Sequence, residues 1–162
     1  MEASGTGNMK FAMNGAVTIG TMDGANIEIL AEVGESNIFI FGLSAEEVRE
    51  TRAQGYSPLS IARKNKELGK VLHQISDGLY CPDDLHRFKP LVDRLIDEGE
   101  HFLVLADYES YIEAQQRVEE AYRDRDGWIR KAILNTANMG EFSSDRSIQN
   151  YADDIWHLKP IG

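Results

Sequence analysis

The stretch NGAVTIGTMDGANIEILAEVGESNIFIFG, residues 14–42, decides the fold that this sequence predicts. It contains two short apolar runs, AVTI at residues 16–19 and IFIF at residues 38–41, and glycine or asparagine bounds each run. Neither run alternates with polar residues, which is typical of parallel strands that are buried on both faces. Residues 25–33 lie between the runs and predict a helix, with Asp23 as its N-cap and a glycine at its end. The stretch therefore predicts one βαβ unit.

The rest of the chain, residues 43–162, is expected to be mainly helical. Helix starts are indicated by capping residues ahead of apolar positions at helical spacing: Ser44 with Glu47, Ser57 with Pro58, Asp83 or Asp84, Asp107, and Ser143 or Ser144. A short apolar run at residues 102–105 is a candidate third strand. Two or three parallel strands are fewer than the roughly five or six of a doubly wound sheet. We therefore predict an α/β fold with a partial doubly wound, Rossmann-like sheet and a helix-rich C-terminal half.

Composition and charge exclude several classes of function. The net charge of −10, from 17 basic and 27 acidic residues, disfavours general binding to nucleic acid. No apolar run approaches the roughly 20 residues that cross a bilayer, and the start of the sequence does not resemble a signal peptide. Cys81 is the only cysteine, so no disulfide within the chain is expected. The single cysteine also predicts a cytoplasmic location. The histidines lack the spacing of metal ligands, so no metal site is predicted: His73, His86, His101 and His157.

The segment EASGTGNMKF, residues 2–11, precedes the βαβ unit and has the features of an anion-binding turn. The glycines of residues 5–7 permit a tight turn and a close approach of the backbone to a ligand. A helix is expected over residues 8–14, and its first N–H groups would face this turn, where a phosphate binds well. Lys10 would lie about one turn into that helix. The alternative interpretation is a flexible start of the chain that runs into a capped helix.

Residues 23–26 (DGAN) form a second candidate site, because they follow the first predicted strand. Open α/β sheets bind ligands beyond the carboxyl ends of their strands. Asp is also a preferred N-cap, so the same four residues are consistent with a capped start of the following helix. We interpret them as a helix start.

The quoted residues resemble a known family. The runs EASGTGNMKF and NGAVTIGTMDGAN are similar to the pyridoxal-phosphate attachment region of the α-glucan (glycogen or maltodextrin) phosphorylases. The resemblance continues through NIFIFG, LADYESY and WIRKAILNTANMGEFSSDRSIQNYADDIW, so it covers the whole chain. It implies that residues 1–162 are the C-terminal part of the cofactor-binding domain of a longer enzyme, with a glycosyltransferase-B type fold. Met1 stands where the family has threonine.

The resemblance also implies roles for individual residues. Lys10 matches the lysine that forms the Schiff base with pyridoxal 5′-phosphate, and Thr6 and Gly7 match the residues that hold its 5′-phosphate. The segment that hydrogen-bonds the glucosyl unit at the cleavage site matches Glu2, Ala3, Ser4 and Gly5. In the family, the cofactor's phosphate exchanges a proton with inorganic phosphate, which attacks a terminal α-1,4-linked glucose and gives glucose 1-phosphate.

The implied partners are therefore an α-1,4-glucan, inorganic phosphate and glucose 1-phosphate, with no nucleic acid and no membrane. The isolated chain is expected to be inactive, because the groups that stabilise charge on the substrate phosphate lie elsewhere in the family's enzymes. It is also expected to retain the cofactor weakly, because one lysine and one turn form only part of the cofactor pocket. Two alternatives remain open: a non-catalytic interaction or assembly domain derived from a phosphorylase, and a general phosphate-binding α/β protein. An exposed sheet edge and apolar faces predict a homo-oligomer or self-association.

Overall fold

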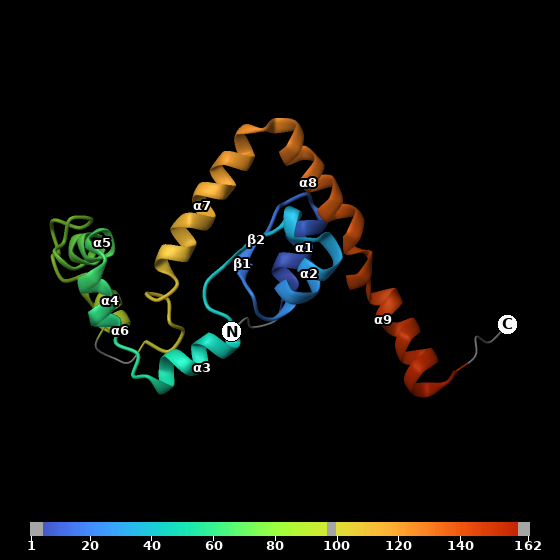
Figure 1. The fold of residues 1–162 in the computed structure, drawn as a ribbon, viewed down its shortest axis with the longest axis horizontal. Coiled ribbons are helices and arrows are strands. Elements are labelled where there is room, and N and C mark those ends of the chain that lie inside the picture. The colour runs from blue at the N-terminus through green and yellow to red at the C-terminus, as the bar shows by residue number, and fades with distance from the viewer. Residues whose placement is uncertain (1–4, 97–99, 159–162) are drawn as a thin grey trace. The chain divides into compact units, whose positions relative to one another are not determined.

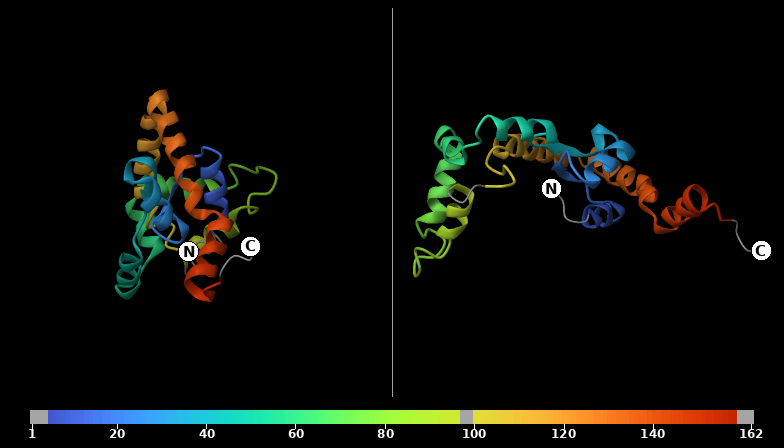
Figure 2. Two further views of the ribbon diagram at one scale, coloured as in Figure 1. Left: turned by 90° about the vertical axis from the view of Figure 1, so that its right-hand side faces the viewer. Right: turned by 90° about the horizontal axis from the view of Figure 1, so that it is seen from below.

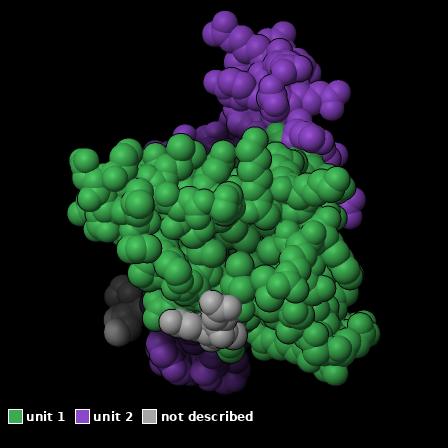
Figure 3. Space-filling view, turned by 90° about the vertical axis from the view of Figure 1, so that its left-hand side faces the viewer, with its two compact units in different colours: residues 1, 41–115 green, residues 2–40, 116–162 purple. Residues whose placement is uncertain are grey.

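The computed structural model describes residues 5–96 and 100–158. The chain divides into two compact units, which Figure 3 shows in different colours. Among the described residues, unit 1 holds 41–96 and 100–115, and unit 2 holds 5–40 and 116–158. Each unit has its own hydrophobic core, so each is described separately below.

Unit 2 contains the beginning and the end of the chain. Its elements are α1 (Thr6–Met13), β1 (Ile19–Thr21), α2 (Ala25–Val33), the 3-10 turn η1 (Glu35–Asn37), most of β2 (Phe39–Phe41), the second half of α7 (Tyr108–Arg123), α8 (Arg125–Asn138), the 3-10 turn η2 (Met139–Phe142), α9 (Ser144–Asn150) and the π-helical turn η3 (Tyr151–Trp156). Helices α1 and α2 pack against each other and against α8 (Figure 1). The same grouping is visible from two further directions in Figure 2.

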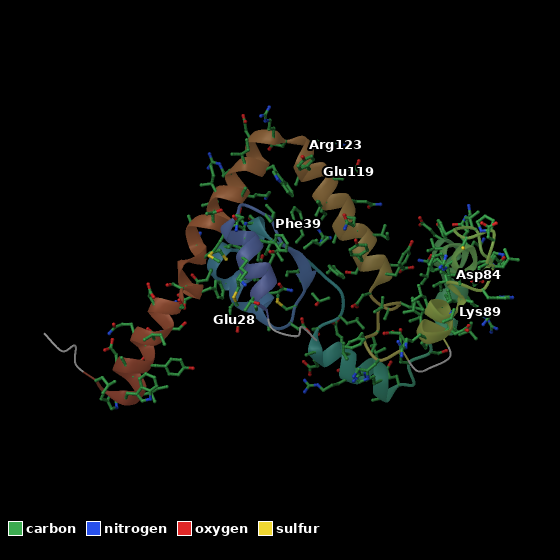
Figure 4. All side chains as sticks on the ribbon, turned by 180° about the vertical axis from the view of Figure 1, so that it is seen from behind. Glu28, Phe39, Asp84, Lys89, Glu119 and Arg123 are labelled. Carbon is green, nitrogen blue, oxygen red and sulfur yellow. The ribbon has the colours of Figure 1, made fainter. Side chains whose placement is uncertain are left out.

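The core of unit 2 is small and is built from α1, α2, η2 and the residue between η1 and β2. It consists of Ala12, Ile29, Val33, Ile38 and Met139. Beside it, Phe39 (labelled in Figure 4) stacks on Trp128 of α8, with ring centroids 6.3 Å apart. Buried Asn135 of α8 donates from its amide to the Asn37 carbonyl at 2.7 Å. These contacts fasten α8 to the segment that leads into β2.

The predicted βαβ unit is confirmed in outline. Strands β1 and β2 form a parallel two-stranded sheet, and α2 has the predicted bounds. Gly34 ends α2 with a φ of 79°, a conformation that favours glycine. The fold is therefore α/β, mostly helical, with a partial doubly wound sheet.

The first strand starts later than the sequence predicts. We expected it over residues 16–19, whereas β1 covers Ile19–Thr21. The reason lies at the end of α1, where the amides of residues 14–16 donate to the carbonyls of Phe11 and Ala12. Backbone groups that close a helix in this way are not available to a sheet. Both strands are half-buried and not fully buried as predicted, because the described sheet has only two strands.

The predicted N-cap of α2 is also wrong. The cap is Gly24, which makes no side-chain capping hydrogen bond. The carboxylate of Asp23 instead accepts a hydrogen bond from the Thr21 hydroxyl at 3.2 Å. The helix thus begins at the predicted residue, but its cap is Gly24 and not Asp23, and Asn26 of the DGAN segment is buried.

Unit 1 contains most of the central part of the chain. Its elements are α3 (Ala45–Ala53), α4 (Pro58–Lys64), α5 (Lys66–Ser76), α6 (Lys89–Ile96) and the first half of α7. Helices α4, α5 and α6 pack together around a core of Ala62, Leu68, Leu72, Val92 and Leu105. The capping box of Ser44 with Glu47 is confirmed at the start of α3, and Ser57 with Pro58 starts α4 as predicted.

Two helix predictions in unit 1 are wrong. The sequence pattern predicts one helix from Ser57 to about residue 77, but the helix is interrupted at Asn65. The Asn65 side chain accepts a hydrogen bond from the Leu68 amide at 2.9 Å and caps α5. The predicted cap at Asp83 or Asp84 fails because residues 79–88 form successive turns, and α6 begins only at Lys89. In both places a side chain accepts a hydrogen bond from a backbone amide, Asn65 from Leu68 and Asp84 from His86, and this local bonding competes with a continuous helix.

The candidate third strand at residues 102–105 is a turn. Leu103 has a φ of 57°, and its carbonyl accepts from the amides of Ala106 and Asp107. Leu103 and Leu105 are buried, whereas Phe102 and Val104 are exposed. The alternating burial resembles that of a strand, but the backbone is used for a turn.

Asp107 connects this turn to the segment that follows β2. Its Oδ1 accepts from the Leu43 amide at 2.8 Å. Burial raises the pKa of the Asp107 carboxyl, and the Leu43 hydrogen bond partly opposes that shift. A carboxyl with a raised folded-state pKa contributes stability at low pH, and this contribution is lost as the pH rises through the folded pKa.

We therefore expect the Asp107→Asn variant to be more stable than wild type at pH 7. Its gain over wild type should be smaller at pH 4. The asparagine Oδ1 still accepts from Leu43, while the cost of a buried charge disappears. The measurement is the urea midpoint of wild type and variant at both pH values, followed by circular dichroism. Asp83→Asn, at an exposed position, is the matched control. A variant that is less stable than wild type at pH 7 would contradict the sign of this prediction.

Candidate functional site

The predicted anion-binding turn begins α1. Gly5 is buried and is the N-cap of the helix, with a φ of 65° in the left-handed region. That conformation favours glycine, as the sequence motif suggests. Thr6 and Gly7 are the first two residues of α1 and are exposed. The helix therefore starts two residues earlier than predicted. The other predicted glucosyl-binding residues lie outside the described residues: Glu2, Ala3 and Ser4.

The start of α1 is suited to a phosphate group. The first turn has no acidic residue, and Gly5 makes no side-chain cap. A Cβ built on Gly7 would meet nothing within 4 Å, so this position opens to space. Helix N-terminal amides and the positive end of the helix dipole both attract anions. The main chain of residues 5–7 can therefore contact an anion closely.

Lys10 is exposed on the same helix, four residues after Thr6. Four residues correspond to a rise of about 6 Å along the helix axis. Side chains in helices tilt toward the N-terminus, so a long lysine side chain extends back over the preceding turn. The amine can therefore react with a group whose phosphate lies at the start of α1. The residues present fit an aldehyde cofactor that carries a phosphate.

A network that the sequence does not predict lies beneath this turn. Asn26 of α2 is 8% exposed. Its Oδ1 accepts from the Asn8 side-chain amide at 2.9 Å, and its own amide donates to the Thr21 carbonyl at 2.9 Å. One side chain thus connects the first turn of α1 to the end of β1.

Gly20 leaves the space that Asn26 occupies. A Cβ at Gly20 would lie 2.5 Å from the Asn26 side-chain nitrogen, which is closer than real Cβ contacts. Glycine inside a strand is the one sequence signal that could have indicated this approach. The identity of the approaching group requires the tertiary structure.

The groove beside β2 in unit 2 does not extend the site. A groove of about 420 Å³ lies beside β2 and is lined by none of the predicted site residues; its lining is Met22, Leu30, Glu35, Ser36, Ile38, Phe39, Ile40 and Arg117. Over residues 5–96 and 100–158, no cluster of three histidine, cysteine or acidic side chains could hold a metal ion. In the same residues, no helix combines the length and the apolar character needed to cross a membrane.

Comparison with known proteins places the sequence in a family. The family model described as carbohydrate phosphorylase matches residues 1–158. The chain is 52% identical over 160 residues to a protein of Synechocystis sp. named glycogen phosphorylase, covering 99% of this chain and 19% of that protein. It is 53% identical over 158 residues to the glycogen phosphorylase of Chlamydia pneumoniae, covering 98% of this chain and 19% of that protein.

A mammalian relative shows the same match. The chain is 48% identical over 159 residues to the brain form of glycogen phosphorylase from Rattus norvegicus, covering 98% of this chain and 19% of that protein. The chain thus spans about a fifth of the length of these relatives, 19% in each case. A family match over residues 1–158 leaves only the last four residues of the chain unmatched. The chain therefore belongs to the carbohydrate phosphorylase family.

Proposed function

We propose that residues 1–162 are the C-terminal part of the cofactor-binding domain of a cytoplasmic α-glucan phosphorylase. The whole enzyme would cleave terminal α-1,4-glucosyl units with inorganic phosphate and release glucose 1-phosphate. The observation that carries this proposal is the exposed amine of Lys10, one turn behind a glycine-capped helix start that has no acidic residue. Family membership supports the same assignment.

Each residue of the turn has a distinct role in this proposal. Lys10 attaches pyridoxal 5′-phosphate covalently and fixes its position. The amides of Thr6 and Gly7 and the Thr6 hydroxyl bind the 5′-phosphate, assisted by the helix dipole. The family resemblance assigns Glu2, Ala3, Ser4 and Gly5 to hydrogen bonds with the glucosyl unit. A tether of this kind needs correct geometry and no special activation of the amine.

The chemistry needs more than this chain supplies. When bound, the cofactor supplies a phosphate group that exchanges a proton with inorganic phosphate. The chain's residues hold that group at the start of α1 and orient it. The charge of the attacking phosphate must be stabilised by other groups, and the chain spans 19% of its relatives' length. The 162 residues by themselves are expected to form no glucose 1-phosphate from glycogen.

A chimera tests the proposed function. The matching segment of the Synechocystis glycogen phosphorylase is replaced by this chain, and glucose 1-phosphate formation from glycogen and phosphate is measured. At 52% identity over 160 residues, we expect the chimera to fold and to retain activity. The unmodified relative is the positive control. A chimera that folds and binds glycogen but forms no glucose 1-phosphate would contradict the proposal.

A non-catalytic assembly domain is the second candidate function. One observation favours it: large apolar side chains are exposed on α9 and η3, including Ile148, Ile155 and Trp156. Exposed apolar patches on a folded chain mark contact surfaces. Sedimentation of the isolated chain at increasing concentration distinguishes the cases, because an assembly domain forms a defined oligomer. A monomer at all concentrations would count against self-association.

A further inference from the structure

We infer that Asn26 is a positioning residue for cofactor attachment at Lys10, acting through the first turn of α1. The inference rests on the proposed function of that turn. Asn26 lies on α2, outside the segment that is predicted to bind the cofactor. It contacts Asn8, which follows Gly7 directly and precedes Lys10 by two residues.

The two hydrogen bonds of Asn26 have opposite polarity. Its oxygen accepts from Asn8 and its nitrogen donates to the Thr21 carbonyl, each at 2.9 Å. Because Asn26 is 8% exposed, water competes weakly for these groups. The amide is therefore held in one orientation, and Asn8 is held with it. This fixes the direction in which the start of α1 faces.

Asn8 also hydrogen-bonds its own helix, since its Oδ1 accepts from the Met9 amide at 2.9 Å. The link from Thr21 through Asn26 and Asn8 therefore ends on the backbone between Gly7 and Lys10. A shift of this link would move the phosphate-binding amides and the amine together. Misplacement by about 1 Å is enough to weaken a preorganised site strongly.

Three variants separate this role from general packing. Asn26→Ala removes both hydrogen bonds. Gly20→Ala leaves Asn26 intact but places a Cβ 2.5 Å from its nitrogen, so the side chain must move. Asn26→Asp keeps the shape and the acceptor; its protonated carboxyl can donate to Thr21, whereas its carboxylate repels that carbonyl. Burial raises the pKa of such a carboxyl, so mild acid restores the donor.

The experiment uses the whole 162-residue chain with pyridoxal 5′-phosphate as the probe. Each protein is incubated with the cofactor, reduced with borohydride, digested, and the label on the Lys10 peptide is quantified against cofactor concentration. Matched controls are Asn138→Ala, which loses one bond to the Leu134 carbonyl, and Gly140→Ala, whose Cβ would meet nothing within 4 Å. Circular dichroism shows that each variant is folded.

We expect Asn26→Ala and Gly20→Ala to need about tenfold more cofactor for half-maximal label at Lys10, while both controls match wild type. The ratio of Asn26→Asp label to wild-type label should rise as the pH falls from about 8 to about 6. A general packing defect would not give this pH dependence. If the alanine variants fail to fold, the Asn26→Asp variant still tests the positioning role.

The outcomes distinguish the two proposals. If wild type is labelled at Lys10 and folded Asn26→Ala is labelled equally, the positioning role is wrong and the proposed function stands. An Asn26→Asp ratio that does not change with pH also overturns the positioning role. If wild type acquires no label at Lys10, the cofactor assignment fails, and the positioning role fails with it.

Discussion

Replacing Lys10 with alanine in the chimeric phosphorylase is expected to lower glucose 1-phosphate formation by roughly 100-fold or more. The variant removes the only covalent attachment that the proposal assigns to the cofactor, so bound cofactor should also be lost on dialysis. The start of α1 still offers amides to the 5′-phosphate, so weak reversible binding can remain. The measurements are initial rates and cofactor absorbance after dialysis.

Lys70→Ala is the matched control for this experiment. Lys70 is exposed on α5 in unit 1, where the proposal assigns no contact with the cofactor. Its variant should keep both the rate and the bound cofactor. A Lys10→Ala chimera that retains full activity and stoichiometric cofactor would show that another lysine carries the attachment.

The second large effect is on stability. Ile29→Ala is expected to lower the free energy of unfolding of unit 2 by about 2–5 kcal/mol. Ile29 is 0% exposed and lies at the centre of the unit 2 core with Ala12, Val33 and Met139. Removing its side chain leaves a cavity beneath α1, and the core is too small to compensate.

The chain offers a sensitive probe and a close control for this prediction. The two tryptophans, Trp128 and Trp156, both lie in unit 2, so tryptophan fluorescence during urea unfolding follows this unit. Ile27→Ala is the control, because Ile27 lies on the same helix and is 50% exposed. Its variant should change the free energy of unfolding by less than about 1 kcal/mol. Equal losses in both variants would contradict the assigned core.

The sequence predicts the local elements that depend on short-range signals. Helix α2 was predicted with its observed bounds, because apolar spacing and Gly34 act within the helix itself. The capping box at Ser44 is a similar case, since both partners lie within four residues. The errors occur where a distant or competing contact determines the local structure. Residue 16 is predicted to begin the first strand, but its amide donates to the Phe11 carbonyl and closes α1.

The residues of the candidate site divide in the same way, into those that the sequence identifies and those that only the fold brings together. Lys10, Thr6 and Gly7 could be named from the sequence because the family resemblance is long and continuous there. The Asn26 network could not, since Asn26 is 18 residues from Asn8 and only the fold brings their side chains together. The DGAN pattern predicts Asp23 as the cap of α2, but the structure has Gly24 at the cap, and the Asn26 side chain bonds the Thr21 carbonyl.

The most direct test of the central claim is to map where pyridoxal phosphate attaches to the wild-type chain. The purified 162-residue protein is incubated with the cofactor, reduced with borohydride, digested and analysed by mass spectrometry. Our account predicts one predominant labelled peptide, containing Lys10. Label spread over several lysines without preference for Lys10 would contradict the claim that α1 begins a cofactor site.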